Sequence, residues 1–134
     1  MKVILKVEPV AKGRPKTRFF NGQAVTYTPT KTKDAQDAIK AILLEKGIGM
    51  QFPPHVPLKM VVTFYRTKSI WLKKKETKPF RKWDLDNAVK LLTDSINGIL
   101  IEDDAAITTC LAKKRWTDRK YGYIVCEITE DRGK

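Results

Sequence analysis

The sequence predicts an α+β fold in which helices pack on one face of a small mixed β-sheet, giving two layers. Short runs rich in β-branched and aromatic residues occur beside longer runs with apolar residues at helical spacing. Because these segments do not alternate as regular strand–helix–strand units, the pattern favours the α+β class. A length of 134 residues with 42% hydrophobic residues supports one buried core, so residues 1–134 are predicted to form a single domain.

The N-terminal part of the chain predicts a strand, a hairpin and a helix. Residues 2–7 are rich in Val, Ile and Leu, as in a partly buried strand. Asn21-Gly22 is a dipeptide typical of a tight hairpin turn. Apolar residues then recur at helical spacing from about residue 33 to residue 46, and Thr30 or Thr32 is expected to cap the start of that helix.

The C-terminal part predicts three strands and a second helix. Residues 58–66 have high β propensity, and residues 84–98 have helical periodicity that stops at an Asn-Gly pair. Residues 107–116 and 121–129 are predicted to be strands. Because residues 117–120 resemble a turn, these two strands are expected to pair as a hairpin.

Two cysteines and one histidine limit the chemistry available to the chain. Cys110 and Cys126 lack CxxC spacing and are expected to be reduced thiols, although the predicted hairpin would place them nearly opposite each other. His55 lies in a proline-rich stretch and is expected to belong to a loop. A single histidine argues against a His-rich zinc site, so catalytic groups are expected among carboxylates, hydroxyls and lysines.

The net charge of the chain indicates the class of its partner. With 27 Lys and Arg against 15 Asp and Glu, the formal charge is +12, which favours nucleic acid before an anionic membrane surface. No apolar run approaches the ~18 residues of a membrane span. The apolar run at the basic start is too short for a signal peptide, so a cytoplasmic protein is expected. Neither GxxxxGK[ST] nor a GxGxxG after a strand occurs, so no nucleotide cofactor is expected.

Negative charge is concentrated in residues 84–104. This segment holds six acidic residues and one basic residue, a net charge of −5, which leaves +17 on the remainder of the chain. Like charges placed together repel, and a divalent cation would relieve that repulsion. Because the segment offers carboxylates without His or Cys, it favours Mg²⁺, with Mn²⁺ as a substitute.

The spacing within this segment suits phosphodiester hydrolysis. Asp84 and Asp86 flank the start of the predicted helix, two residues apart, and Lys90 follows Asp86 by one helical turn. Asp103 and Asp104 would return beside them from the loop after the helix. A cation held there would polarise a phosphate and lower the pKa of the attacking water, while the lysine stabilises negative charge.

The same residues also have purely structural interpretations. Asp84 is placed to cap the helix, Lys90 to form a surface ion pair with Asp86 or Asp94, and Asp103 to form part of a polar turn. On that interpretation, the protein would bind nucleic acid without being an enzyme.

Two basic segments are candidates for contacts with nucleic-acid phosphates. In the first, alternate residues are basic and are separated by Gly13 and Pro15; the second leads directly into Asp84. Such clusters bind the backbone without reading its sequence. The residues expected to make these contacts are Lys12, Arg14, Lys16, Arg18, Arg81 and Lys82.

Three strings in the acidic segment carry a family resemblance. They are Lys82-Trp83-Asp84-Leu85-Asp86-Asn87-Ala88-Val89-Lys90, Asp94-Ser95-Ile96-Asn97-Gly98 and Glu102-Asp103-Asp104-Ala105-Ala106-Ile107. Together they resemble the signature of the RusA Holliday junction resolvases. Lys12-Gly13-Arg14-Pro15-Lys16 resembles a basic N-terminal segment common in one branch of that family, so the likeness runs from about Pro9 to Trp116.

The resemblance implies a small α+β homodimer that binds four-way DNA junctions and, with Mg²⁺, introduces paired symmetric nicks in DNA recombination and repair. By position it implies that Asp84, Asp86 and Asp104 are the catalytic metal ligands, with Asp104 preferred to Asp103, and that Lys90 is the essential lysine. The alternatives are a nuclease that acts on flaps or forks and a non-enzymatic nucleic-acid-binding protein.

Overall fold

The computed structural model describes residues 1–10, 16–27, 30–68 and 84–132. None of the helices in these ranges is long and apolar enough to cross a membrane. The elements are, in chain order, β1 (Lys2–Leu5), β2 (Lys16–Phe20), β3 (Gln23–Tyr27), α1 (Thr30–Glu45), β4 (Leu58–Thr67), α2 (Leu85–Ile96), the 3₁₀ helix η1 (Asp104–Ala106), β5 (Ile107–Thr117) and β6 (Tyr123–Glu130).

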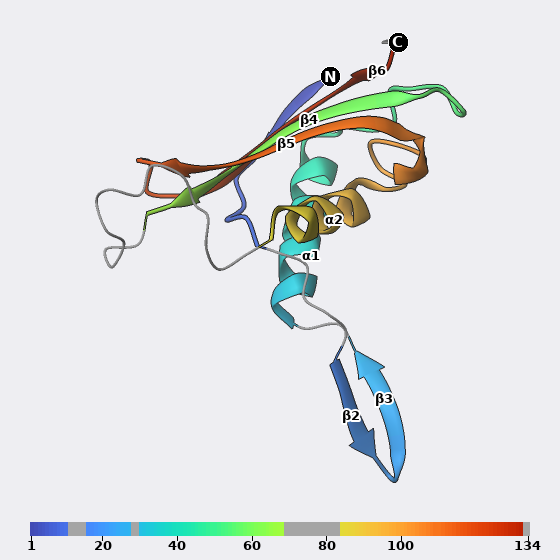
Figure 1. Ribbon diagram of the computed structural model, residues 1–134, viewed down its shortest axis with the longest axis vertical. Coiled ribbons are helices and arrows are strands. Elements are labelled where there is room, and N and C mark those ends of the chain that lie inside the picture. Colours follow the sequence, from blue (N-terminus) through green and yellow to red (C-terminus); the bar gives the residue numbers. More distant parts are fainter. Residues whose placement is uncertain (11–15, 28–29, 69–83, 133–134) are drawn as a thin grey trace.

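Four of the strands form one mixed sheet in the order β1–β6–β4–β5 (Figure 1). β6 pairs antiparallel with both β1 and β4, whereas β5 pairs in parallel with β4. A parallel pair needs a crossover connection, and α2 lies within the one that joins β4 to β5. α1 and α2 cover the same face of the sheet, so the predicted two-layer α+β fold is confirmed.

The predicted hairpin of residues 107–116 with residues 121–129 is wrong. β5 and β6 follow each other in the chain but lie on opposite sides of β4. β4 suits the central position because every second residue of 58–64 is buried. Because β4 lies between β5 and β6, the segment that connects these two strands spans two inter-strand spacings, about 10 Å in all. Cys110 and Cys126 are therefore separated by β4, and both are free thiols, as expected.

β2 and β3 form a separate hairpin that projects away from the sheet (Figure 1). Asn21 and Gly22 have φ values of 51° and 75°, the positive values that a type I′ turn requires, so the predicted turn is confirmed. α1 begins at Thr30, ahead of the predicted start at residue 33. Thr32 lies inside the first turn and is buried, so it packs against the protein instead of capping the helix.

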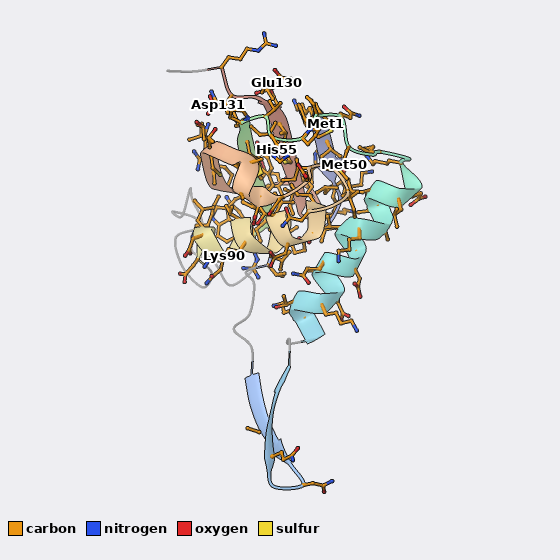
Figure 2. All side chains as sticks on the ribbon, turned by 90° about the vertical axis from the view of Figure 1, so that its right-hand side faces the viewer. Met1, Met50, His55, Lys90, Glu130 and Asp131 are labelled. Carbon is orange, nitrogen blue, oxygen red and sulfur yellow. The ribbon has the colours of Figure 1, made fainter. Side chains whose placement is uncertain are left out.

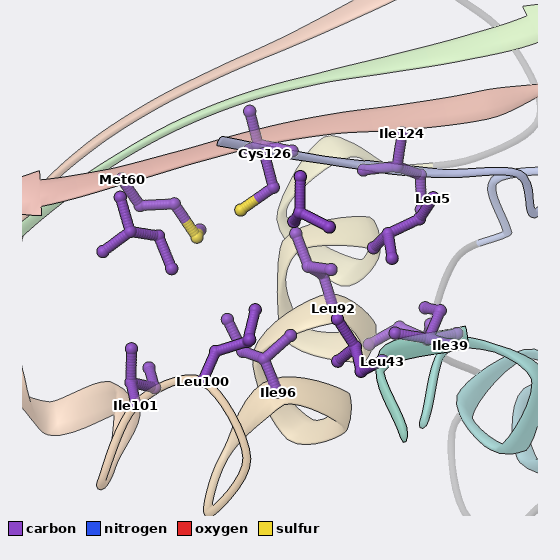
Figure 3. Close-up of a cluster of buried hydrophobic side chains, with 14 of the residues drawn as sticks. Leu5, Ile39, Leu43, Met60, Leu92, Ile96, Leu100, Ile101, Ile124 and Cys126 are labelled. Carbon is purple, nitrogen blue, oxygen red and sulfur yellow. The ribbon is translucent and has the colours of Figure 1, made fainter. Parts of the chain in front are cut away.

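A hydrophobic core fills the space between the sheet and the two helices (Figure 3). The core fixes the position of α2 against the sheet, and with it the positions of the acidic residues near both ends of that helix. The core side chains labelled in Figure 3 are Leu5, Ile39, Leu43, Met60, Leu92, Ile96, Leu100, Ile101, Ile124 and Cys126.

Gly122 lies where the fold leaves no room for a side chain. A Cβ at this position would overlap the Glu8 carboxylate and lie 2.9 Å from the backbone oxygen of Tyr65. Glu8 is itself held in place, because it accepts hydrogen bonds from the backbone N–H and the hydroxyl of Thr67 at 3.1 and 3.0 Å. Gly122→Ala is therefore expected to lower the free energy of unfolding by about 1–3 kcal/mol, measured by urea denaturation.

Gly49→Ala is the matched control, because a Cβ at Gly49 meets no atom within 4 Å. We expect its free energy of unfolding to be equal to or slightly above that of the unmodified protein, since Ala restricts the unfolded chain. An equal loss in both variants would contradict the steric explanation.

Candidate active site

The start of α2 presents two carboxylates to solvent. Asp84 is the residue before the helix and Asp86 lies in its first turn, and both are exposed. Although Asp84 occupies the N-cap position, its side chain makes no capping hydrogen bond. Its Oδ2 instead accepts a hydrogen bond from Asn87 Nδ2 at 3.4 Å. The side chain of Asp84 therefore does not have the structural role that the capping interpretation gave it.

Lys90 lies one turn further along α2, with an exposed side chain (Figure 2). The structural interpretation paired it with Asp86 or Asp94. Within residues 84–132, however, Lys90 forms no ion pair with either carboxylate. Its ammonium group is thus positioned on the surface of the helix that carries Asp86, where it can meet an approaching anion.

The loop after α2 is held in one conformation by backbone hydrogen bonds. The Asn97 N–H donates to the Thr93 carbonyl at 3.0 Å, and the Gly98 N–H donates to the Ile101 carbonyl at 2.7 Å. Gly98 has a φ of 78°, in the left-handed region that favours glycine. Ile101 is buried in the core. These contacts place residues 102–104 at a fixed position relative to the end of the helix.

Asp103 and Asp104 are neighbouring carboxylates at the point where the loop enters η1, and each affects the pKa of the other. Asp103 caps η1, because its Oδ1 accepts from the backbone N–H of Ala105 at 3.3 Å. Hydrogen bonds from Asp104 and then from the Ala105 backbone lower the pKa of Asp103. The pKa of Asp104 is raised, first by its interaction with Asp103, then by partial burial and by the negative charges of Asp103 and Asp94. The Asn97 side chain has the opposite effect and lowers this pKa.

The groups around Asp104 have the donor chemistry that suits a hard divalent cation. Asp103 and Asp94 both add negative charge near its carboxylate. Asn97 adds an amide whose Oδ1 is buried and has no hydrogen-bond partner. Mg²⁺ and Mn²⁺ prefer oxygen ligands, and a positive ion here would relieve the repulsion that raises the pKa of Asp104. The residue types at this end of α2 are therefore those that such an ion prefers.

The three predicted metal ligands come from two places along the chain. Asp84 and Asp86 lie at the start of α2, whereas Asp104 lies in η1, beyond its end. In the parts of the chain that the structure describes, no three His, Cys, Asp or Glu side chains are arranged to hold a metal ion. The assignment of these aspartates to one metal site, with Lys90 as the catalytic lysine, therefore stays a prediction.

Only two of the six residues predicted to contact DNA phosphates lie in the described residues. Lys16 and Arg18 are on β2, in the hairpin that projects from the sheet (Figure 1). The assignment of all six residues to DNA binding stays a prediction. Those outside the described residues are Lys12, Arg14, Arg81 and Lys82.

Two features near Asp104 were missed by the sequence analysis. Asn97 is expected from the sequence only to stop the helix, yet its side chain also acts to lower the pKa of Asp104. His55 does lie in a loop, as expected, with a positive φ of 62°, and it lines a cavity of about 570 Å³ together with Glu102 and Asp103. No sequence motif indicates either feature, because the first depends on the conformation of the loop after α2 and the second on the packing of residues 55–57 against residues 102–108.

Asp104→Asn is expected to stabilise the metal-free protein near neutral pH. Because the folded-state pKa of Asp104 is raised, the folded protein binds this proton more tightly than the unfolded chain. The stability that the protonated Asp104 carboxyl contributes is complete at pH values below its pKa in the unfolded chain. This stability is lost as the pH rises through the higher pKa of Asp104 in the folded protein. Asparagine does not ionise, so the variant avoids that loss at neutral pH. Its free energy of unfolding should rise by at most about 1 kcal/mol, because the carboxylates of Asp103 and Asp104 contact solvent.

Thermal unfolding without divalent ions tests this expectation. The midpoint of Asp104→Asn should exceed that of the unmodified protein at pH 7, and the difference should disappear at pH 3. A difference of the same size at both pH values would show that charge repulsion is not its cause.

The fold and the site together define a class of protein. An acidic, oxygen-rich site in a chain with a net charge of +12 is typical of enzymes that act on nucleic-acid phosphates. The family model described as Endodeoxyribonuclease RusA matches residues 6–128, nearly the whole chain. The chain therefore belongs to the RusA family of endodeoxyribonucleases, which are Holliday junction resolvases.

This membership confirms the resemblance found in the sequence and decides against the non-enzymatic alternative. Nucleases of the family generally depend on a divalent metal ion and act on branched DNA. The chain is also similar to the uncharacterized protein YqaN of Bacillus subtilis (strain 168). The two are 24% identical over 119 residues, which cover 83% of this chain and 84% of that protein.

Proposed function

We propose that the protein resolves four-way DNA junctions by paired symmetric nicks, as a homodimer, with Mg²⁺ as its metal ion. The observation that carries this proposal is the environment of Asp104, whose carboxylate lies among Asp94 and Asp103 in a strongly basic chain. An acidic site repels a DNA phosphate unless a cation neutralises it, whereas the basic remainder of the chain attracts DNA.

Each residue of the site has a distinct task in this proposal. Asp84, Asp86 and Asp104 hold the ion, and their carboxylates orient the attacking water toward the phosphate. Bound Mg²⁺, for which Mn²⁺ is a substitute, polarises the phosphate and lowers the pKa of water. Lys90, one helical turn from Asp86, stabilises the negative charge that builds up on the phosphate oxygens.

A homodimer explains how two nicks are paired. A four-way junction has two equivalent strands to cut, and a two-fold symmetric protein presents one site to each of them. The basic segments that include Lys12, Arg14, Arg81 and Lys82 hold the junction through its phosphates, so binding should weaken steeply with added salt.

Cleavage of a panel of branched substrates tests the proposal. The substrates are a synthetic mobile four-way junction, a flap, a replication fork, a single strand and a linear duplex, each with Mg²⁺ or with EDTA. We expect nicks at symmetric positions on two opposite strands of the junction, with Mg²⁺ only. Faster cleavage of flaps or forks than of the junction would instead assign the enzyme to other branched DNA. Cleavage that persists in EDTA would contradict the metal requirement.

A further inference from the structure

Three tyrosines cluster on the face of the sheet that is turned away from α1 and α2 (Figure 1). Tyr65 of β4 and Tyr123 of β6 are register partners, and their rings stack with centroids 4.5 Å apart. Their chain neighbours Phe64 and Ile124 are buried in the core, so alternation along the strands places the tyrosines on the opposite face. Tyr121 meets Tyr123 edge to face at 6.2 Å and has 42% of its surface exposed. Tyrosine rings at a surface are enriched in interaction sites.

Two cations are held on these rings. The Lys6 ammonium group lies 5.4 Å from the centroid of the Tyr121 ring. The Arg119 guanidinium group lies 4.9 Å from the centroid of the Tyr123 ring. Arg119 is fixed further, because its backbone N–H donates to Thr117 Oγ1 at 3.1 Å and its Nη1 donates to Tyr121 Oη at 3.4 Å. The rings attract both cations and so position them before any ligand arrives.

Neither of these cations forms an ion pair within the part of the chain that the structure describes. Glu8 is already engaged, because it accepts hydrogen bonds from Thr67 and lies 3.9 Å from Arg66. Asp118 precedes Arg119 in the chain but is exposed and, among the described residues, has no ion-pair partner. A cation that is held in position without a counter-ion is well placed to bind an external anion.

The other charges on this face favour DNA over a second copy of the chain. Exposed lysines lie at positions of the same face on three strands, at Lys2 of β1, Lys59 of β4 and Lys113 of β5. Glu127 of β6 adds one negative charge. A second copy related by two-fold symmetry would bring the same cations against each other, which is unfavourable. A DNA strand would instead neutralise them.

Lys6, Arg119 and the three tyrosines together form what we call the tyrosine surface. We propose that the tyrosine surface binds unpaired DNA: Lys6 and Arg119 contact phosphates, and the exposed Tyr121 ring stacks on a base. Cations that follow the backbone and rings that stack on bases are the usual means of binding unpaired strands. Bases within a duplex are already stacked on each other, so the surface should favour unpaired DNA. The inference rests on the proposed function, since branched DNA would supply the unpaired bases.

Binding measured without cleavage tests the stacking contact. Fluorescence anisotropy in EDTA gives dissociation constants for a single-stranded oligonucleotide, a four-way junction and a blunt duplex. We expect Tyr121→Ala to raise the constant for the single strand by about 5-fold or more, as loss of a stacking ring does, and to leave that for the duplex nearly unchanged. Tyr121→Phe keeps the ring and should bind like the unmodified protein. A single-strand constant that Tyr121→Ala does not change would overturn the proposal.

The double variant Lys6→Ala/Arg119→Ala tests the phosphate contacts. Each contact to a single strand contributes about 0.7 to the slope of log affinity against log salt concentration, so this slope should fall by about 1.4. Lys31→Ala/Lys33→Ala is the matched control, because it removes the same charge from exposed positions on α1. We expect the control to keep the slope. An equal change in both double variants would show that net charge alone is responsible, and would overturn the role of the surface.

Sedimentation separates DNA binding from self-association. Tyr121→Ala and the unmodified protein should have the same mass at the same concentration. A smaller species in the variant would identify the face as an interface between copies of the chain and would overturn the proposal.

Cleavage of the four-way junction by the unmodified protein with Mg²⁺ separates this failure from failure of the proposed function. If the junction is not cleaved but Tyr121→Ala weakens single-strand binding, the proposed function is wrong and the tyrosine surface stands. If the junction is cleaved and Tyr121→Ala binds every DNA like the unmodified protein, the tyrosine surface alone is wrong.

Discussion

Asp86→Asn is expected to abolish DNA cleavage while binding of a four-way junction survives or strengthens. Asparagine has nearly the shape of aspartate but lacks its charge, so it holds a divalent cation much less well. Because a metal ion contributes several kcal/mol of transition-state stabilisation and each 1.4 kcal/mol is tenfold in rate, cleavage should fall at least ~100-fold. Removal of a negative charge next to DNA phosphates favours binding.

Single-turnover cleavage with Mg²⁺ and gel-shift titration in EDTA measure the two effects separately. Asp37→Asn is the matched control, since it removes the same charge from an exposed position on α1, outside the site. We expect the control to cleave at the unmodified rate. Full cleavage by Asp86→Asn, or an equal loss in both variants, would refute the role given to this carboxylate.

Leu92→Ala is expected to cause a large loss of stability. Leu92 is completely buried on α2, where its side chain packs in the core between the sheet and the helices (Figure 3). Leucine-to-alanine changes at such sites cost about 2–5 kcal/mol, because they lose apolar burial and leave a cavity. That is a large share of the roughly 5–15 kcal/mol that stabilises a typical domain.

Urea denaturation of Leu92→Ala and of a surface counterpart measures this effect. Leu44 lies on α1 with 71% of its surface exposed, so Leu44→Ala removes the same atoms without leaving a cavity. Its free energy of unfolding should stay within about 0.5 kcal/mol of the unmodified value. Similar losses in the two variants would mean that α2 is not packed as described. The site would then lack the rigid support that positions Asp86 and Lys90.

Elements with strong local signals could be predicted from the sequence. Asn21-Gly22 specifies its own turn because both residues tolerate positive φ. The apolar spacing of residues 84–98 predicted α2 within a few residues of its ends, and with it the surface that carries Asp86 and Lys90. In each case residues close together in the sequence specify the element, and its packing against the rest of the chain favours the same conformation.

Strand pairing and the surroundings of Asp104 could not be predicted in the same way. Periodicity indicates which face of a strand is buried, but it does not specify the neighbouring strand. Closeness in the chain therefore predicts that β5 pairs with β6, whereas in the structure β4 lies between them. The loop held by Gly98 and Ile101 brings Asp104 under the influence of Asp94 and Asn97, and no motif encodes that arrangement.

The position of a bound metal ion shows whether Asp84, Asp86 and Asp104 form one site. We suggest crystals grown with Mn²⁺ and diffraction data collected at a wavelength where its anomalous scattering is strong. We expect one or more anomalous peaks with oxygens of Asp84, Asp86 and Asp104 in the coordination shell. Those three side chains pointing apart, with no peak between them at saturating Mn²⁺, would contradict it.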